Sequence, residues 1–224
     1  MMGFINNKIT NKFLSIISTL VLTSCVNGTI YGELLSNLSS LFFEDNNISI
    51  EKVNSVPYAS LQVKIGNSKN SLLVLEEEVN DILKWTSSNL VKIYTKNGYV
   101  IKVSGIGNDL SRLELDKDHP AISKNFDDVD HIYTSYYNFE NPKLYQLPIK
   151  TKFSFIKEET LDVFGKMITL NLYKEVSLTN LIDWDFENLF WVNKKGEIIK
   201  SIQNFTPKNK PLSILEAKKY KKPD

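Results

Sequence analysis

The sequence predicts a mainly β protein, an antiparallel half-open barrel or sandwich with a short N-terminal helix. Apolar and polar residues alternate repeatedly through residues 46–217, as expected of strands with one buried face. Clusters of Gly, Asn and Asp interrupt this alternation about every ten residues, which is typical of β sandwiches and barrels. The chain has no fixed repeat and no Pro-rich linker, so residues 46–217 are expected to form one β-rich domain.

The composition is that of a globular protein and excludes several functional classes. Among 224 residues there are 27 Lys and Arg against 26 Asp and Glu, a net charge of +1, and 42% hydrophobic residues. A near-neutral chain lacks the basic excess of nucleic-acid-binding proteins. One cysteine and two histidines exclude an internal disulfide and leave little for a metal centre. We expect no metal and no cofactor.

Residues 1–24 have the pattern of a bacterial lipoprotein signal peptide. Lys8 and Lys12 supply a positive start, and residues 13–22 are an apolar run. This run is too short to cross about 30 Å of hydrocarbon as a helix, but it fits the apolar part of a secretion signal. Residues 22–25 read Leu-Thr-Ser-Cys, which matches the lipobox: an aliphatic residue, two small residues and a cysteine. We expect cleavage before Cys25 and lipid attachment to its thiol.

Two other interpretations of this segment stay open: a plain secretory signal with an incidental thiol at Cys25, or a buried helix of a cytosolic protein. The chain has no other cysteine, which favours the lipobox. Two or more acyl chains, at about 0.8 kcal/mol per buried CH₂ group, hold a protein on a membrane. Val26 follows the cysteine where an aspartate commonly retains lipoproteins at the inner membrane. The expected location is therefore the periplasmic face of the outer membrane.

Residues 25–45 are expected to form a lipidated tether and an amphipathic helix at about 30–43. Six apolar residues recur at helical spacing: Ile30, Leu34, Leu35, Leu38, Leu41 and Phe42. The polar face lacks the lysines of a membrane-surface helix, which favours packing against the rest of the protein over lying on the membrane.

From residue 48 onward the apolar period changes to two. Residues 58–65 and 71–79 are predicted strands around a turn at 66–70. Residues 90–94 and 99–103 form the strongest hairpin pattern, because Asn97-Gly98 suits the two positive-φ positions of a type I′ turn.

The second half continues this pattern after a region of weak signal. Residues 104–130 are predicted to be loop with a possible short helix or strand. Strands are then expected at five ranges: 132–139, 149–155, 158–164, 167–176 and 189–193. A hairpin turn is expected at Gly165, a loop at 178–187, and a last strand at 197–205 after a turn at 194–196.

Residues 218–224 form a basic tail that contains Lys218, Lys219, Lys221 and Lys222. A solvated tail is the favoured interpretation. Attraction to anionic lipid headgroups or to an acidic polysaccharide is the alternative.

Several landmarks occur in a characteristic order behind the lipobox. Pro57-Tyr58 opens a strand, and Trp85 precedes a strand that leads to Asn97-Gly98. The later landmarks are Phe153-Ser154-Phe155, Glu159-Thr160-Leu161, Gly165, Phe190-Trp191-Val192 and Gly196. In this order and spacing the chain resembles the YjbF family, the group 4 capsule polysaccharide lipoproteins, also called GfcB-like. The match thins at about residues 107–145.

The resemblance implies a β-rich half-barrel and a role in export of capsule or exopolysaccharide, with polysaccharide-export proteins as partners. It supplies no catalytic motif for these residues. The first expectation is therefore an accessory lipoprotein without enzymatic activity. The alternative is a module that binds a lipid or glycan in the concave face of the half-barrel, which would require an apolar cavity lined by inward-facing strand residues.

Two groups of acidic residues are candidates for chemical sites. Asp127, Asp128 and Asp130 lie near His119 and His131, but the spacing and the turn glycine of a calcium loop are missing, which favours a solvated loop. Residues 76–78 are three consecutive glutamates, whose side chains a strand would send to alternating faces. Neither group predicts a paired acid and base, and no Gly-x-Ser-x-Gly motif suggests a hydrolase.

Aromatic residues are the remaining candidates for glycan contact, because sugar rings stack on exposed aromatic faces. Tyr133, Tyr136 and Tyr137 cluster on one predicted strand. Alternation places Tyr133 and Tyr137 on one face and Tyr136 on the other. Packing in the core or at an interface rim is favoured over glycan contact for this group, and core packing is favoured for Trp191.

Overall fold

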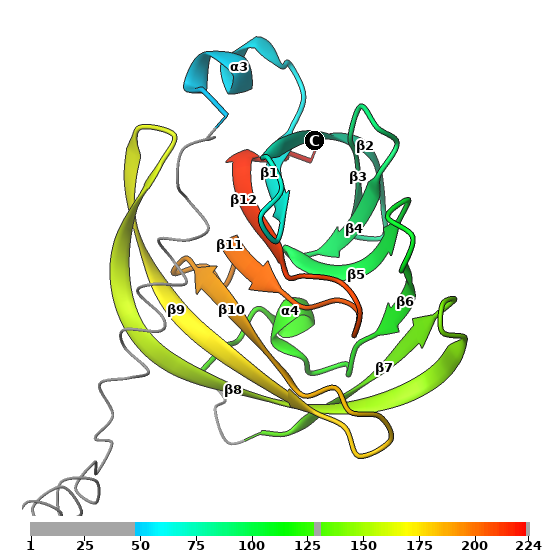
Figure 1. Cartoon of the computed structure of the whole chain (residues 1–224). Coiled ribbons are helices and arrows are strands. Elements are labelled where there is room, and N and C mark those ends of the chain that lie inside the picture. The colour runs from blue at the N-terminus through cyan, green and yellow to red at the C-terminus, as the bar shows by residue number, and fades with distance from the viewer. Residues whose placement is uncertain (1–47, 128–130, 223–224) are drawn as a thin grey trace, which may run out of the picture. The chain divides into compact units, whose positions relative to one another are not determined.

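The computed structural model describes residues 48–127 and 131–222, which form strands joined mostly by tight turns (Figure 1). Cys25 and the helix expected at residues 30–43 lie outside the described residues. Two helices are described, α3 (Ile50–Ser55) and α4 (Pro120–Ser123). The described strands are β1 (Ser60–Ile65), β2 (Ser71–Val79), β3 (Ile82–Thr86), β4 (Lys92–Lys96), β5 (Tyr99–Ser104), β6 (Leu110–Glu114), β7 (Tyr133–Phe139), β8 (Leu144–Val163), β9 (Lys166–Leu178), β10 (Phe186–Val192), β11 (Ile198–Gln203) and β12 (Leu212–Lys218).

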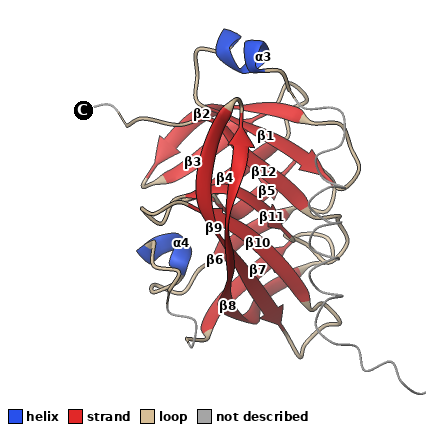
Figure 2. Ribbon diagram, turned by 90° about the vertical axis from the view of Figure 1, so that its left-hand side faces the viewer, coloured by secondary structure: helices blue, strands red, loops and turns tan. Residues whose placement is uncertain are grey.

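All twelve described strands belong to one antiparallel sheet in the order β5-β4-β3-β2-β1-β12-β11-β10-β9-β8-β7-β6. The edge strands β5 and β6 follow each other in the chain and lie side by side, so the sheet curls into a nearly closed barrel (Figures 1 and 2). No shared hydrogen-bond ladder joins these two edges. The predicted antiparallel β class is confirmed, and the half-open barrel is refined to a nearly closed one.

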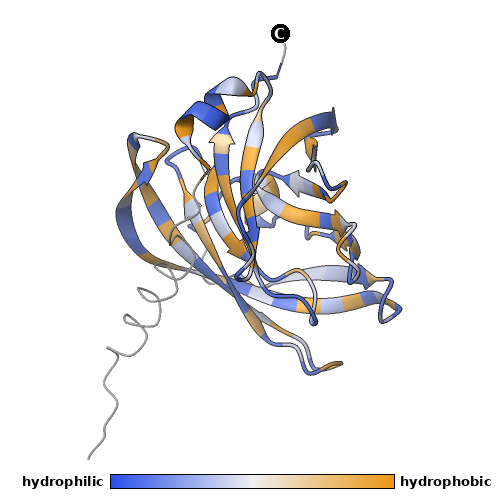
Figure 3. Cartoon of the chain, turned by 45° about the horizontal axis from the view of Figure 1, so that its top comes forward, coloured by the Kyte–Doolittle hydropathy of each residue, from blue (hydrophilic) through white to orange (hydrophobic). Residues whose placement is uncertain are grey.

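Alternation determines which side chains face the barrel interior, and Figure 3 shows apolar and polar residues following one another along the strands. Leu61 and Val63 of β1 belong to the core cluster. The two best-marked turns are confirmed by their backbone angles: Asn97 and Gly98 have φ of 47° and 80°, and Gly165 has φ of 79°. Glycine tolerates such positive φ values because it has no Cβ.

Two elements, α3 and β8, differ from the sequence prediction. Residues 50–55 form helix α3 within the region from residue 48 onward where the sequence predicts an apolar period of two, and Ser49 caps the helix by accepting from the backbone N–H of Lys52. Strand β8 is one strand of 20 residues instead of two. A register shift between Phe155 and Lys157 lets it bend while it pairs with β7 along its first part and with β9 along most of its length.

Strands β3 and β12 were not predicted. β12 lies between β1 and β11 in the sheet, and its first four residues are buried whichever face they point to, so it lacks a clean alternation. β3 follows a turn at Asn80 and Asp81, whose φ values of 52° and 62° replace the glycine that would have marked a hairpin.

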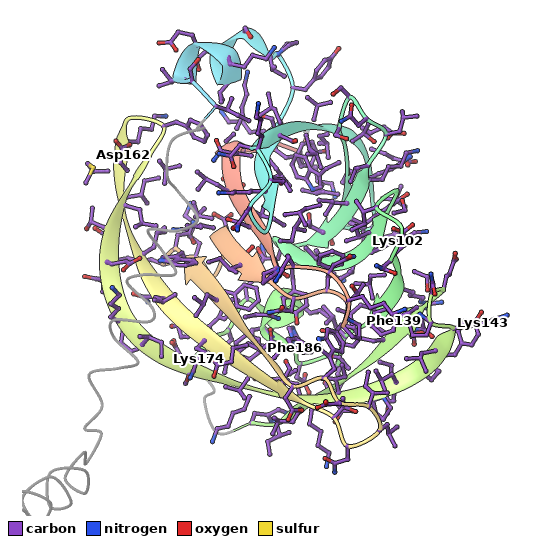
Figure 4. All side chains as sticks on the ribbon, viewed as in Figure 1. Lys102, Phe139, Lys143, Asp162, Lys174 and Phe186 are labelled. Atoms are coloured by element: carbon purple, nitrogen blue, oxygen red, sulfur yellow. The ribbon has the colours of Figure 1, made fainter. Side chains whose placement is uncertain are left out.

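The connection between β6 and β7 folds into the barrel and fills part of its interior. His119, Ala121 and Phe126 of this segment are buried, and α4 lies within it. The His119 ring makes edge contacts with three aromatic rings, those of Tyr99, Tyr133 and Phe153. Figure 4 shows the space enclosed by the sheet crowded with side chains, including those of Phe139 and Phe186.

Candidate functional site

The residue on which the predicted anchor depends, Cys25, lies outside the described residues, so its lipidation stays a prediction. Among residues 48–127 and 131–222 no helix is long and apolar enough to cross a bilayer.

The tyrosines proposed for glycan contact divide as alternation predicted. Tyr133 and Tyr137 are 2% and 1% exposed, and their rings pack against His119 and Trp184 respectively. Tyr136 is 40% exposed. Burial removes Tyr133 and Tyr137 from the surface, so of the three only Tyr136 is available to a glycan.

The acidic and histidine cluster is dispersed where it is described. His119 is fully buried, its Nδ1 accepts from the backbone N–H of Ala121 at 3.1 Å, and burial lowers its pKa to about 3. His131 and Asp127 are exposed, and Asp127 accepts from the Tyr173 hydroxyl at 2.8 Å. Residues 128–130 are not described. The described part of the chain contains no group of three or more His, Cys, Asp and Glu residues that could hold a metal ion.

The three consecutive glutamates of β2 all form ion pairs with lysines. Glu76 lies 2.6 Å and Glu77 3.6 Å from the ammonium group of Lys84 on the neighbouring strand. Glu78 faces Lys222 at 3.5 Å. Each of the three carboxylates therefore has a lysine partner.

Three lysines of the basic tail contact the barrel, while Lys219, Lys221 and Lys222 stay exposed to solvent, as the favoured interpretation predicts. Lys218 is the last residue of β12 and donates to the carbonyl oxygen of Val56 at 2.8 Å. Lys219 pairs with Glu197 at 2.7 Å. Lys222 bridges Glu78 and Asp81, at 3.5 and 3.6 Å, across the end of the β2–β3 hairpin.

A cavity of about 370 Å³ opens at the end of the barrel to which this tail is fastened. Helix α4 and the C-terminal tail lie on this side, at the left of Figure 2. Its apolar lining comes from five parts of the chain and includes Leu61, Leu83, Trp85, Ala121, Ile122, Ile198 and Ile214. Its rim carries charges of both signs, from Glu78, Asp81, Lys96, Lys124, Glu197, Lys219 and Lys222.

Two polar groups in the wall of this cavity differ in how they are satisfied. The indole N–H of Trp85 donates to the hydroxyl of Thr95 at 2.9 Å, so the ring presents only its apolar surface. Glu216 also lines the cavity, where burial raises its carboxyl pKa to about 7. No described side chain donates a hydrogen bond to that carboxyl group, and Glu216 is the register partner of Leu61 in the β1–β12 pair.

A second buried carboxyl group lies deeper in the barrel. Glu175 is fully buried and accepts from the hydroxyl of Tyr99 at 2.9 Å and from the side-chain amide of Asn188 at 2.8 Å. Burial raises its pKa to about 7. Sequence reasoning missed it, although Glu175 lies two residues from the inward-facing Tyr173 on a predicted strand, a spacing that places both on one face.

Comparison with known proteins identifies the family. The model of a family described as group 4 capsule polysaccharide lipoprotein GfcB, YjbF, matches residues 35–215, which is most of the chain. The chain belongs to this family.

One curated relative and one solved structure are similar to this chain. An uncharacterized lipoprotein GfcB of Escherichia coli K12 is 21% identical over 178 residues, covering 76% of this chain and 81% of the relative. The crystal structure of the hypothetical lipoprotein YmcC of Escherichia coli K12 matches with a TM-score of 0.70 and 21% identity, covering 83% of this chain and 95% of that one. The resemblance to the YjbF family is thus confirmed, and the YmcC likeness supports the fold alone.

The family match covers nearly all of the barrel but not the C-terminal tail. The match at residues 35–215 includes the buried Glu175 and every strand except the end of β12, while the tail lysines Lys218, Lys219 and Lys222 lie beyond it. The matched region therefore supplies the apolar lining of the cavity, and the tail adds charges to its rim.

Proposed function

We propose that this protein is an outer-membrane lipoprotein that faces the periplasm and acts, without enzymatic activity, as an accessory in assembly or export of a capsule or exopolysaccharide. The observation that carries the proposal is the match of residues 35–215 to a family described as group 4 capsule polysaccharide lipoprotein. The lipobox at residues 22–25 supports the membrane location. Its partners would be polysaccharide-export proteins.

The absence of enzymatic activity is supported by the contacts of the acidic residues that the sequence offered. Glu76, Glu77 and Glu78 are engaged by lysines, and Asp127 is exposed and bound to a tyrosine hydroxyl. General acid–base chemistry requires positioned groups that reach the same region of a substrate, and these four do not form such a pair.

The anchor is tested by Cys25→Ser, which removes the thiol that would carry the lipid. The native chain should fractionate with outer membranes, whereas the variant should lose this location and keep its β-rich circular dichroism spectrum. Retention of the variant in the outer-membrane fraction would show that Cys25 is not the anchor.

The role in polysaccharide export is tested by deleting the gene in an encapsulated host and measuring surface polysaccharide. We expect a reduced amount, restored by the native chain but not by Cys25→Ser expressed at the same level. An unchanged amount of surface polysaccharide in the deletion strain would contradict the accessory role.

A second candidate function is a module that binds a lipid or glycan in the concave interior of the barrel. The cavity of about 370 Å³ favours it, since ligand pockets usually begin at about 300 Å³ and combine apolar walls with a few polar groups. The two functions are compatible, because an accessory protein can carry a ligand between partners.

A further inference from the structure

We propose that the cavity of about 370 Å³ at the end of the barrel binds the hydrocarbon chain of a single-chain amphiphile, with the polar head of that molecule at the charged rim. This inference rests on the second candidate function and specifies its ligand and its residues. It does not depend on which polysaccharide the protein serves.

Much of the cavity wall is apolar, although Thr95, Lys200 and Ser201 also line it. Leu61 of β1, Leu83 of β3 and Ile214 of β12 project from three strands toward the same space, and α4 contributes Ala121 and Ile122. These side chains have no hydrogen-bonding groups, so they gain from contact with apolar surface and offer nothing to the hydroxyl groups of a sugar.

The aromatic residues of the lining do not form a sugar platform. Trp85 is 2% exposed, and its indole N–H is already bound to Thr95. Tyr220 belongs to the tail at the rim. A glycan site would need an exposed ring face with polar side chains beside it, whereas here the ring is part of an aliphatic floor.

The rim is suited to a polar head that stays in water. Lys219 and Glu197 form an ion pair at 2.7 Å, and Lys222 pairs with Glu78 and Asp81, so polar groups from the tail and two hairpins surround the opening. Glu216 lies in the chain between the buried Ile214 and the exposed Lys219, and all three residues line the cavity. The carboxyl group of Glu216 has no donor among the described side chains and is available to a ligand head.

The test is titration of myristic acid, below its micelle-forming concentration, into the full chain carrying Cys25→Ser, so that no attached acyl chain competes. We expect saturable binding of one myristate per chain by isothermal calorimetry. Leu83→Trp fills the cavity and should weaken binding by at least about tenfold, since a ligand pocket of this size tolerates little added volume.

Ile82→Trp is the matched control. Ile82 precedes Leu83 on β3, is partly buried to a similar degree, and does not line the cavity. Its tryptophan variant should bind myristate like the parent chain. Binding that does not saturate, or equal affinity of the Leu83→Trp chain, would overturn the proposal.

A second measurement needs no substitution in the cavity. A myristate analogue with a diazirine at its chain end should cross-link, on illumination, to peptides that contain Trp85, Ile198 or Ile214. Cross-links confined to other peptides would overturn the proposal. Normal surface polysaccharide in the deletion strain would overturn the accessory role and leave these binding results intact, so the two failures are distinguishable.

Discussion

Two titratable side chains inside the barrel, Glu175 and His119, are held in their neutral forms by burial, and they affect stability in opposite directions. The pKa of Glu175 rises from 4.5 to about 7, so between these values the folded state keeps a proton that the unfolded chain has released. Stability from this group therefore falls as pH rises through about 7. The pKa of His119 falls from 6.5 to about 3, so its contribution is lost as pH drops below 6.5.

Glu175→Gln isolates the carboxyl contribution. The amide keeps the shape of the protonated acid and its partners Tyr99 and Asn188 but cannot ionise. Relative to the native chain, the free energy of unfolding of the variant should rise by about 3 kcal/mol between about pH 5 and about pH 8, since one pKa unit corresponds to about 1.4 kcal/mol. Urea unfolding at each pH measures this, and a difference that does not change with pH would contradict the assignment.

Gly196 is the residue at which an added methyl group should be least tolerated. Its φ is +71°, and a Cβ there would collide with the carbonyl oxygen of Lys124, in the segment that enters the barrel. Gly196→Ala should lower the free energy of unfolding by at least about 3 kcal/mol, because strain and a backbone collision add.

Gly107→Ala is the control for this substitution, because Gly107 has φ of +92° and no atom lies within 4 Å of the place that an added methyl group would take. It should cost only the conformational strain, about 1–2 kcal/mol. Equal losses for the two alanine variants in urea unfolding would show that the contact with Lys124 is unimportant.

At the residue scale, the sequence predicted which face of a strand a side chain occupies better than it predicted which residues that side chain contacts. Alternation correctly separated Tyr136 from Tyr133 and Tyr137. The contacts of Glu175 with Tyr99 join residues 76 positions apart, and such a pairing depends on the curl of the whole sheet, which no local pattern encodes.

At the scale of elements, amide side chains connect the β4–β5 hairpin to strands on the far side of the barrel. The Gln203 side chain of β11 accepts from the backbone N–H of Val100 and donates to the carbonyl oxygen of Gly98, both at 2.9 Å. Asn97 donates to the carbonyl oxygen of Gly196 at 2.8 Å. The first of these bonds satisfies a backbone N–H of the edge strand β5, and the other two hold the turn at Asn97 and Gly98.

Gln203→Leu should loosen this connection. The substitution leaves the buried N–H of Val100 and the partly buried carbonyl of Gly98 without these partners, which should cost about 3 kcal/mol of unfolding free energy. Hydrogen exchange at the Val100 amide should accelerate more than exchange in β9 and β10.

Gln146→Leu is the control for that change, since Gln146 is exposed and its side chain donates only to Glu114, at 3.1 Å. It should shift the free energy of unfolding by less than about 0.5 kcal/mol. Unchanged protection of Val100 in the Gln203→Leu chain would contradict the proposed role of Gln203.

Strands and hairpins were predicted correctly where their turns contain glycine. They were missed where contacts between residues distant in sequence determine the structure. The hairpins at Gly98 and Gly165 were located from their turn residues. β12 was missed because a central strand buried on both faces has no alternation, and the bend in β8 was missed because a register shift leaves no mark in the sequence.

At the scale of the molecule, the described residues form one curled sheet with a ligand-sized cavity at one mouth and a tail fastened beside it. Composition argued against nucleic-acid binding, and the order of landmarks indicated the family, but the residues that line the cavity could not be predicted. Its lining comes from strands as distant in sequence as β1 and β12, and their approach follows only from the closed strand order. The predicted anchor at Cys25 joins this barrel to its proposed membrane setting.

Intact-mass spectrometry of the protein isolated from membranes of a bacterial host tests the central claim, that this barrel is tethered by lipid. The predicted result is a chain that begins at Cys25 and carries fatty acids on that residue. A chain that begins at any other position, or one without fatty acids, would contradict the claim.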